Sequence, residues 1–296
     1  MLANRGILLA FLASAAFSMK AIFVKLAYIH GVDAVLLLAL RMAFSLPALL
    51  VAAWWSGRNS ELALTPRDWR NIILLGFVGY YLSSLLDFLG LAYVSAGLER
   101  LILFLYPTVV VLISVYMFGK SISRRAIFAM VLSYVGIGIA FVHDIEITGD
   151  HQATMIGGGL IFLCMITYAV YLVGSGQMTN RMGATRFAAL ATTVAAVSVM
   201  IHFMLASPLV EAVQQPWQVY AYAAGMAVLS TILPIFLTAK AIQLIGASKV
   251  SIVGSIGPVA TIFFGWLILG EDVSVEQMVG AAFVLGGVML VSSKKA

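Results

Sequence analysis

The sequence is poor in cysteine and in charge. Its single cysteine, Cys164, lies inside an apolar run, so no disulfide framework holds the fold together. Charged residues make up only 10% of the 296 residues, whereas soluble domains carry about 25%. Hydrophobic residues make up 62% and the mean hydropathy is +1.06. A soluble fold of this length could not bury so much apolar surface, and the composition therefore indicates a protein that lies in lipid.

The short motifs of common enzyme classes are also missing. No HExxH, GxSxG or GxxxxGK[ST] pattern occurs, and no cysteine or histidine spacing is typical of a metal site. The triplet at 157–159, Gly-Gly-Gly, begins an apolar run and is not a phosphate-binding loop. We therefore expect no catalytic residue, no metal and no cofactor. The sequence therefore also lacks the phosphate-binding motif of ATP-driven proteins.

Apolar runs of membrane-spanning length recur along the whole chain. We expect ten transmembrane helices, in an all-α integral membrane fold. Their expected spans are 6–28, 34–55, 71–90, 94–117, 124–142, 155–175, 185–206, 218–238, 247–269 and 275–292. The first run is long enough to span a bilayer and nine more follow, so we interpret it as a helix and not as a signal peptide. No loop is long enough to form a soluble domain.

Basic residues sort to one side of the expected membrane. That side carries Arg5, Arg58, Arg67, Arg70, Lys120, Arg124, Arg125, Arg181, Arg186, Lys240, Lys294 and Lys295. The loops of the other side contain no Lys or Arg and carry Asp33, Asp144, Glu146, Asp150, Glu211, Glu271, Asp272 and Glu276. Because cytoplasmic loops are enriched in Lys and Arg, we expect both termini in the cytoplasm, with the chain in a bacterial inner membrane as a monomer or homodimer. The formal charge of +5 then reflects topology, and we expect no nucleic-acid partner.

The two halves of the chain repeat each other. A shift of 151 residues without a gap matches Gly6 with Gly157, Ala96 with Ala247, Pro107 with Pro258, Gly119 with Gly270 and Gly136 with Gly287. We therefore expect two five-helix repeats, over 1–145 and 153–296. Five is odd, so the second repeat must be inverted in the membrane. Inverted repeats place a substrate site near the midplane and allow alternating access.

A proline is followed twelve residues later by a glycine in each half. Pro107 precedes Gly119 and Pro258 precedes Gly270. The two five-helix halves and these stretches resemble the EamA domains of the drug/metabolite transporter superfamily. The pair Gly270-Glu271 fits that pattern, whereas Gly119 is followed by Lys120. The resemblance implies a central cavity between the halves. It does not name a substrate, because the family carries amino acids, nucleotide sugars, phosphorylated sugars and other metabolites.

Both prolines interrupt a helix at equivalent positions. Pro107 and Pro258 are thus candidates for a gating role, and an ordinary proline kink is the alternative. Small residues on the fifth and tenth expected helices, such as Gly136 and Gly287, would let helices approach closely. We expect those two helices to pack at the periphery, away from the substrate.

Charged residues inside the expected spans need a reason, because the bilayer makes them costly. They are Lys20, Lys25, Arg41, Asp87, Glu99, Arg100 and Lys249. Lys25 and Lys249 lie near helix ends, where long side chains reach the interface. If two equivalent positions both face the cavity, both should be polar. The repeat pairs Lys20 with Tyr171, Arg41 with Thr192, Asp87 with Thr238 and Arg100 with Ser251, whereas it pairs Glu99 with Val250.

The expected substrate site combines these pairs with two tyrosines on the same helical faces. Its candidate residues are Lys20, Arg41, Tyr80, Asp87, Arg100, Tyr168, Tyr171, Thr192, Thr238 and Ser251. Three positive groups and one negative group in a low dielectric require an anion. We expect a small anionic or zwitterionic substrate with a carboxylate or phosphate, which arginine binds in bidentate fashion. The alternative is a structural network in which Asp87 neutralises Arg41 or Arg100, with the hydroxyl groups serving helix packing.

The sequence therefore predicts a secondary transporter, an exporter or exchanger, with a proton or a counter-substrate as coupling partner. Asp87 is the residue that could take up such a proton. An intramembrane enzyme acting on a lipid-linked substrate and a passive channel are the alternatives. The enzyme would need a cluster of acids or histidines at one membrane face, and Asp87 and Glu99 lie on different expected helices.

Overall fold

The fold is a bundle of apolar helices. The computed structural model describes residues 2–58, 63–118 and 122–292, and these contain no strand. Eight segments are long and apolar enough to cross a membrane, namely Asn4–Tyr28, Ala34–Arg58, Pro66–Leu91, Ala96–Met117, Arg124–Glu146, His151–Met182, Ala184–Ala206 and Trp217–Ile245. Two shorter apolar helices, Gly257–Leu269 and Val275–Leu290, follow them. The chain is therefore an integral, multi-pass membrane protein.

Several segments are divided into shorter elements. The α-helices are α1 Leu2–Tyr28, α2 Ala34–Arg58, α3 Pro66–Gly76, α4 Ser83–Leu91, α5 Ala96–Leu103, α6 Tyr106–Phe118, α7 Arg124–Thr148, α8 His151–Met182, α9 Ala184–Ala206, α10 Trp217–Ala227, α11 Leu233–Ile245, α12 Ala247–Gly254, α13 Gly257–Phe264 and α14 Val275–Ser292. The π-helical elements are η1 Phe77–Leu82, η3 Val228–Ile232 and η4 Gly265–Leu269, and η2 Leu209–Ala212 is a 3₁₀ turn.

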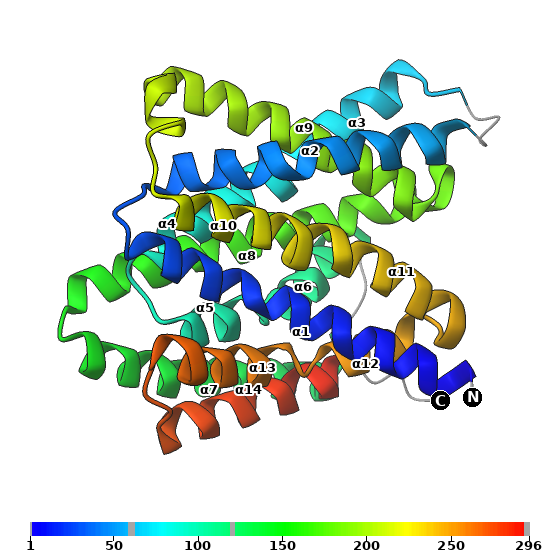
Figure 1. Cartoon of the computed structure of the whole chain (residues 1–296). Coiled ribbons are helices and arrows are strands. Elements are labelled where there is room, and N and C mark those ends of the chain that lie inside the picture. The colour runs from blue at the N-terminus through cyan, green and yellow to red at the C-terminus, as the bar shows by residue number, and fades with distance from the viewer. Residues whose placement is uncertain (1, 59–62, 119–121, 293–296) are drawn as a thin grey trace.

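The helical segments run back and forth between two ends of the bundle (Figure 1). One end, called here the basic end, holds the start of α1 and the end of α14 (Figure 1). By the bounds of the helices, the described basic residues at or near the helix ends on this side are Arg5, Arg58, Arg67, Arg70, Arg124, Arg125, Arg181, Arg186 and Lys240. The opposite end, called the acidic end, holds the connections after α1, α7 and η4 and the turn η2, with the acids Asp33, Asp150, Glu211, Glu271 and Asp272. Lys120, Lys294 and Lys295 lie outside the described residues. The fold thus separates the loop charges by end.

Several helices run beyond their expected spans, and α7 and α8 show why. α7 continues to Thr148 and not to 142, and α8 begins at His151 and continues to Met182. In α7 and α8, the polar residues that follow the apolar run continue the helix and do not end it. Each helix ends instead at a glycine with a positive φ, Gly149 at 65° and Gly183 at 87°, a conformation that glycine adopts at little cost.

The irregular segments recur at equivalent places in the two halves. A turn at Phe104–Leu105 divides α5 from α6, and a turn at 255–256 divides α12 from α13, 151 residues later. The π-helical η1 and η3 begin at Phe77 and Val228, again 151 residues apart. Pro107 and Pro258 are each the second residue of the helix after the turn, where a missing N–H costs nothing.

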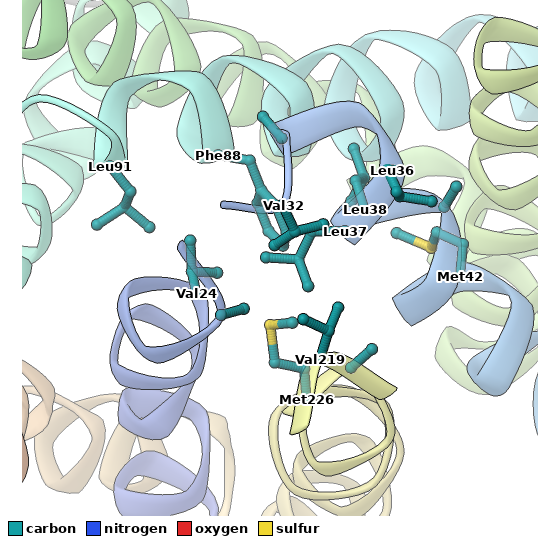
Figure 2. Close-up of a cluster of buried hydrophobic side chains, with 14 of the residues drawn as sticks. Val24, Val32, Leu36, Leu37, Leu38, Met42, Phe88, Leu91, Val219 and Met226 are labelled. Carbon is teal, nitrogen blue, oxygen red and sulfur yellow. The ribbon is translucent and has the colours of Figure 1, made fainter. Parts of the chain in front are cut away.

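A hydrophobic cluster fills the acidic end of the bundle (Figure 2). It joins Val24 of α1 and Leu37 of α2 with Phe88 of α4, all of the first half. Val219 and Met226 of α10 add the second half. Because these side chains are fully or almost fully buried, the halves pack against each other without space between them at this end.

α7 and α14 pack against each other through glycine. A Cβ at Gly287 would lie 2.5 Å from the carbonyl oxygen of Ala129 and would collide with Ser133 Oγ, whereas one at Gly286 would lie 3.6 Å from Leu132 Cδ2. Neither helix contributes to the lining of the cavity described below. Close packing away from the cavity matches the expectation for the fifth and tenth helices.

Adding one methyl group should therefore separate these two positions. We expect Gly287→Ala to lower the melting temperature of the purified protein, because overpacking costs about 1–3 kcal/mol. Gly286→Ala, its matched control one residue away, should leave the melting temperature nearly unchanged. Thermal unfolding in detergent measures both, and equal melting temperatures for the two variants would contradict the close α7–α14 contact.

Candidate functional site

A cavity of about 270 Å³ lies between the two halves. Its walls come from α1, α2, η1, α4, α5 and the start of α6 in the first half, and from α8, α12 and α13 of the second. Of the side chains expected in the site, Lys20, Arg41, Tyr80, Asp87, Arg100 and Tyr168 line it. These residues come from six helical elements, and the fold brings them to one place.

Lys20 holds two carboxylates at once. Its Nζ lies 2.6 Å from Asp87 Oδ2 and 2.9 Å from Glu99 Oε1. The three residues come from α1, α4 and α5, and they are 6%, 2% and 0% exposed. Charge-assisted hydrogen bonds of this length compensate the desolvation of such groups only where the geometry is good. Lys20 therefore joins three helices through one buried ammonium group.

Arg41 of α2 is bonded to a neutral partner from the other half. Its Nε and Nη2 donate to Thr231 Oγ1 of η3 at 3.3 and 3.1 Å. The guanidinium carbon lies 5.6 Å from the ring centroid of Phe88, within the range of a cation–π contact. Among the described residues, no carboxylate oxygen lies within 4.0 Å of Arg41.

Arg100 of α5 repeats this arrangement. Its Nε donates to Thr261 Oγ1 of α13 at 3.0 Å, and its Nη2 donates to the carbonyl oxygen of Phe17 at 2.9 Å. Its guanidinium carbon lies 4.9 Å from the ring centroid of Phe17. Within the described part of the chain, Arg100 also makes no salt bridge. Both arginines are thus buried, oriented and bonded across the interface by threonine.

These contacts correct the expected charge pattern. Asp87 pairs with Lys20, and not with Arg41 or Arg100. Glu99, which the repeat set apart from the site, supplies a second negative group. The comparison of equivalent positions in the two halves excluded Glu99, because its equivalent Val250 is apolar. A residue that neutralises a charge needs only that one partner, and it needs no polar equivalent in the other half. The local balance is therefore three positive groups to two negative groups, and not three to one.

Tyrosines form one side of the site. Tyr80 and Tyr171 place their hydroxyl oxygens 3.3 Å apart, and their ring centroids lie 4.8 Å apart. Tyr168 stacks on Tyr171 at 6.1 Å and meets Tyr106 edge-on at 5.6 Å. Tyr106 lines the cavity, whereas Tyr171 packs behind the wall. The side chains form a continuous aromatic surface.

Three hydroxyl candidates are not part of the cavity wall as described. Thr192 is buried in α9, and its Oγ1 donates to the carbonyl oxygen of Ala188 in the same helix at 2.8 Å. Thr238 is half-buried on α11. Ser251 lies on α12, and its side chain lies outside what the structure describes. The packing role that polar residues have in membrane helices accounts for Thr192.

Sequence reasoning missed the groups that join the halves around the cavity. The turn between α12 and α13 interrupts the helical hydrogen-bond ladder there. Ser14 Oγ and Ser18 Oγ of α1 donate to the carbonyl oxygens of Gly254 and Gly257 on either side of this turn, both at 3.1 Å. The sequence did contain one indication of this contact. The two serines are four residues apart, which places both on one face of the helix.

The sequence pointed to Thr231 but not to Thr261. Thr231 is the repeat equivalent of Tyr80 and shares a helical face with Thr238, so the sequence carried a signal for it. Thr261 has the apolar Val110 as its equivalent, and only the fold places it beside Arg100.

Comparison with known proteins agrees with this architecture. The profile of the EamA-like transporter family matches the chain twice, over residues 4–142 and 155–293. The uncharacterized transporter YcbK of Bacillus subtilis (strain 168) is 30% identical over 293 residues, which cover 98% of this chain and 92% of the relative. The uncharacterized transporter YyaM of the same organism is 24% identical over 75% of this chain and 72% of its own length. A solved crystal structure shares the fold with a TM-score of 0.67 at 16% identity, over 96% of this chain and 94% of the other. The chain is a membrane protein that belongs to the EamA-like transporter family.

Proposed function

We propose that the protein is a secondary transporter, an exporter or exchanger, that moves a small metabolite bearing a carboxylate or phosphate across a bacterial inner membrane. One observation carries this proposal. Two buried arginines, Arg41 and Arg100, line the cavity between the halves without a carboxylate within 4.0 Å in the described part of the chain. Arginine recognises carboxylate and phosphate through paired N–H donors.

The charge balance supports an anionic group on the ligand. Lys20, Arg41 and Arg100 face Asp87 and Glu99, which leaves one positive charge without a negative counterpart. Such an excess is unfavourable in a low dielectric, and a bound anion removes it. A zwitterion also fits, because Asp87 Oδ1 has no hydrogen-bond donor among the described residues. The volume of about 270 Å³ suits a small metabolite.

The threonine contacts suggest how binding drives the transport step. Arg41 and Arg100 belong to the first half, and their partners Thr231 and Thr261 belong to the second. An incoming carboxylate or phosphate competes for the same N–H donors and forms stronger, charge-assisted bonds. Binding therefore weakens two contacts between the halves. A ligand that interacts differently with two states shifts the balance between them, as alternating access requires.

The proposal includes ten membrane crossings in two inverted five-helix repeats, residues 1–145 and 153–296. The divided segment α12–α13–η4 is the ninth crossing and α14 is the tenth. The alternation between the basic and acidic ends (Figure 1) and the matching irregularities of the two halves support this count. The protein would act in the lipid bilayer as a monomer or homodimer. Its coupling partner would be a proton or a counter-substrate.

Reporter fusions test the orientation of this topology. We expect a reporter fused after Ala296 to indicate the cytoplasm and one inserted at 144–150 to indicate the periplasm, because the basic loops face the cytoplasm. Alkaline phosphatase and green fluorescent protein, each active on one side only, measure the two sites. Both sites reporting one compartment would contradict the ten-crossing topology.

A thermal-shift screen with matched ligand pairs tests the anion requirement. Each pair would contain a carboxylate or phosphate metabolite and its neutral amide, ester or dephosphorylated analogue. We expect only anionic members to raise the melting temperature, because a ligand at 100 times its Kd stabilises the bound state by about 2.7 kcal/mol. Equal shifts from the neutral partners would contradict the anion site.

A further inference from the structure

The first turn of α5 is held by side chains from both halves. Ser95 caps it, and Ser95 Oγ accepts a hydrogen bond from the backbone N–H of Leu98 at 3.1 Å. The N–H of Ser95 donates to Asp144 Oδ2 of α7 at 3.1 Å. The N–H of Ala96 donates to Glu271 Oε1, from the connection between η4 and α14, at 3.0 Å. Two carboxylates thus satisfy backbone donors at the start of one helix.

Close packing fixes this contact in place. Gly270 has a φ of 68° and turns the chain so that the N–H of Glu271 donates to the carbonyl oxygen of Gly265 at 3.2 Å. A Cβ at Gly265 would lie 2.8 Å from Glu271 Oε2, and one at Gly97 would collide with Gln277 Nε2 of α14. An added Cβ would displace these side-chain ends, so Glu271 packs on η4 and α5 sits directly against the second half.

α5 connects this contact to the cavity. Glu99 and Arg100 follow Ala96 by three and four residues, so they lie about one turn further along the same helix. Glu99 bonds Lys20, and Arg100 bonds Thr261. A short helix moves as one body, because its backbone hydrogen bonds fix its shape. The position of its first turn consequently sets the position of both charged side chains.

We propose that Glu271 is a positioning residue that holds α5 in the register that places Arg100 and Glu99 in the cavity, and that its bond to α5 is a latch that opens when the cavity opens toward the acidic end. The proposal rests on the proposed alternating access. Glu271 belongs to the second half and α5 to the first. Any movement that separates the halves at the acidic end must break this bond, whereas the bond of Asp144 stays within the first half.

The pH should change the strength of the latch. Glu271 lies outside the membrane-spanning segments, and burial raises the pKa of its carboxyl group, opposed by the backbone N–H of Ala96 and by Lys25 of α1. Asp144 of α7 also raises this pKa. The neighbouring acid Glu276 of α14 interacts with His143. From α5 and η4, only backbone groups face Glu271. Because burial raises the pKa of Glu271 in the closed latch, proton binding favours the closed form, and the latch weakens as the pH rises through the raised pKa.

The native cysteine provides the test. Cys164 lies in the cavity wall and is the chain's single cysteine, so a membrane-impermeant methanethiosulfonate reagent added at the acidic end reports access to the cavity. Membrane vesicles of both orientations would be labelled without any ligand. The variants are Glu271→Ala, Glu271→Gln and Asp272→Ala, the last a control at the exposed neighbouring residue.

We expect graded labelling rates from the acidic end. Glu271→Ala should label about tenfold faster than Asp272→Ala, since it loses a hydrogen bond to a charged group. Glu271→Gln keeps the acceptor oxygen without the charge and resembles the protonated carboxyl group, so it should label more slowly than wild type above the pKa of Glu271. As the pH falls, the wild-type labelling rate should approach that of Glu271→Gln. The ratio of the two rates at each pH removes the pH dependence of the thiol reaction itself, which both proteins share.

Two results would overturn the latch. The first is a Glu271→Ala rate equal to that of Asp272→Ala, and the second is a wild-type to Glu271→Gln ratio that does not change with pH. The second comparison does not depend on folding of the alanine variant. Because no ligand is present, failure of the anion proposal leaves these rates unaffected, and failure of the latch leaves the thermal-shift screen unaffected.

Discussion

Arg100→Ala and Arg41→Ala should each abolish or strongly weaken ligand binding while the protein still inserts and folds. A bidentate charged contact in a desolvated site is worth about 2 kcal/mol or more, which weakens affinity more than about tenfold. Both guanidinium groups are buried and bonded to threonine, not to a carboxylate. Their removal therefore leaves no buried carboxylate without its partner, and folding should survive.

Matched variants distinguish recognition from packing. Thr231→Val and Thr261→Val remove the hydroxyl partner of each arginine and keep the shape of the side chain. We expect them to retain binding, because the ligand itself would satisfy the arginines. Titration of the best ligand from the thermal-shift screen measures all four variants. If the arginine variants bind as wild type does, the charges belong to a structural network and the proposed anion site is wrong.

Lys20→Met should have the largest effect on stability. Lys20 is the shared hydrogen-bond donor of Asp87 and Glu99, and both carboxylates are almost fully buried. Removing one partner of a buried pair costs about 3–5 kcal/mol, because it leaves uncompensated charge behind. We expect much less folded protein and a strongly lowered melting temperature, measured by size-exclusion chromatography and thermal unfolding in detergent.

Neutralising the two acids provides the control for this variant. The triple variant Lys20→Met, Asp87→Asn, Glu99→Gln has no unpaired charge at the three positions, so it should recover folding relative to Lys20→Met alone. A Lys20→Met protein with wild-type stability would show that the three side chains do not depend on one another as the distances of 2.6 and 2.9 Å indicate.

The fold was predictable to the extent that hydropathy and the repeat carry it. Apolar length located the helices, and the shift of 151 residues anticipated two halves. Helix ends were less predictable, because α7 and α8 extend through polar residues until Gly149 and Gly183. Hydropathy reports where lipid ends, whereas backbone hydrogen bonds continue until a residue such as glycine stops them.

The site was predictable as a set of residues and not as a set of contacts. Arg41 and Arg100 stood out because a charge in a membrane span needs a reason. The predicted partner of Asp87, Arg41 or Arg100, was wrong, because Asp87 pairs with Lys20. Helical periodicity gives the face on which a residue lies but not the rotation of the helix within the bundle. Glu99 was excluded by a symmetry argument, yet it bonds Lys20. Whether these residues bind a substrate stays a prediction.

Counterflow in proteoliposomes tests the central claim most directly. Vesicles containing wild-type protein would be loaded with the unlabelled anionic ligand and diluted into a trace of the labelled form, beside vesicles containing Arg41→Ala or Arg100→Ala. The account predicts saturable uptake that rises with internal ligand in wild type and is lost in both variants. Uptake that does not saturate and does not respond to internal ligand, or equal uptake by the arginine variants, would contradict it.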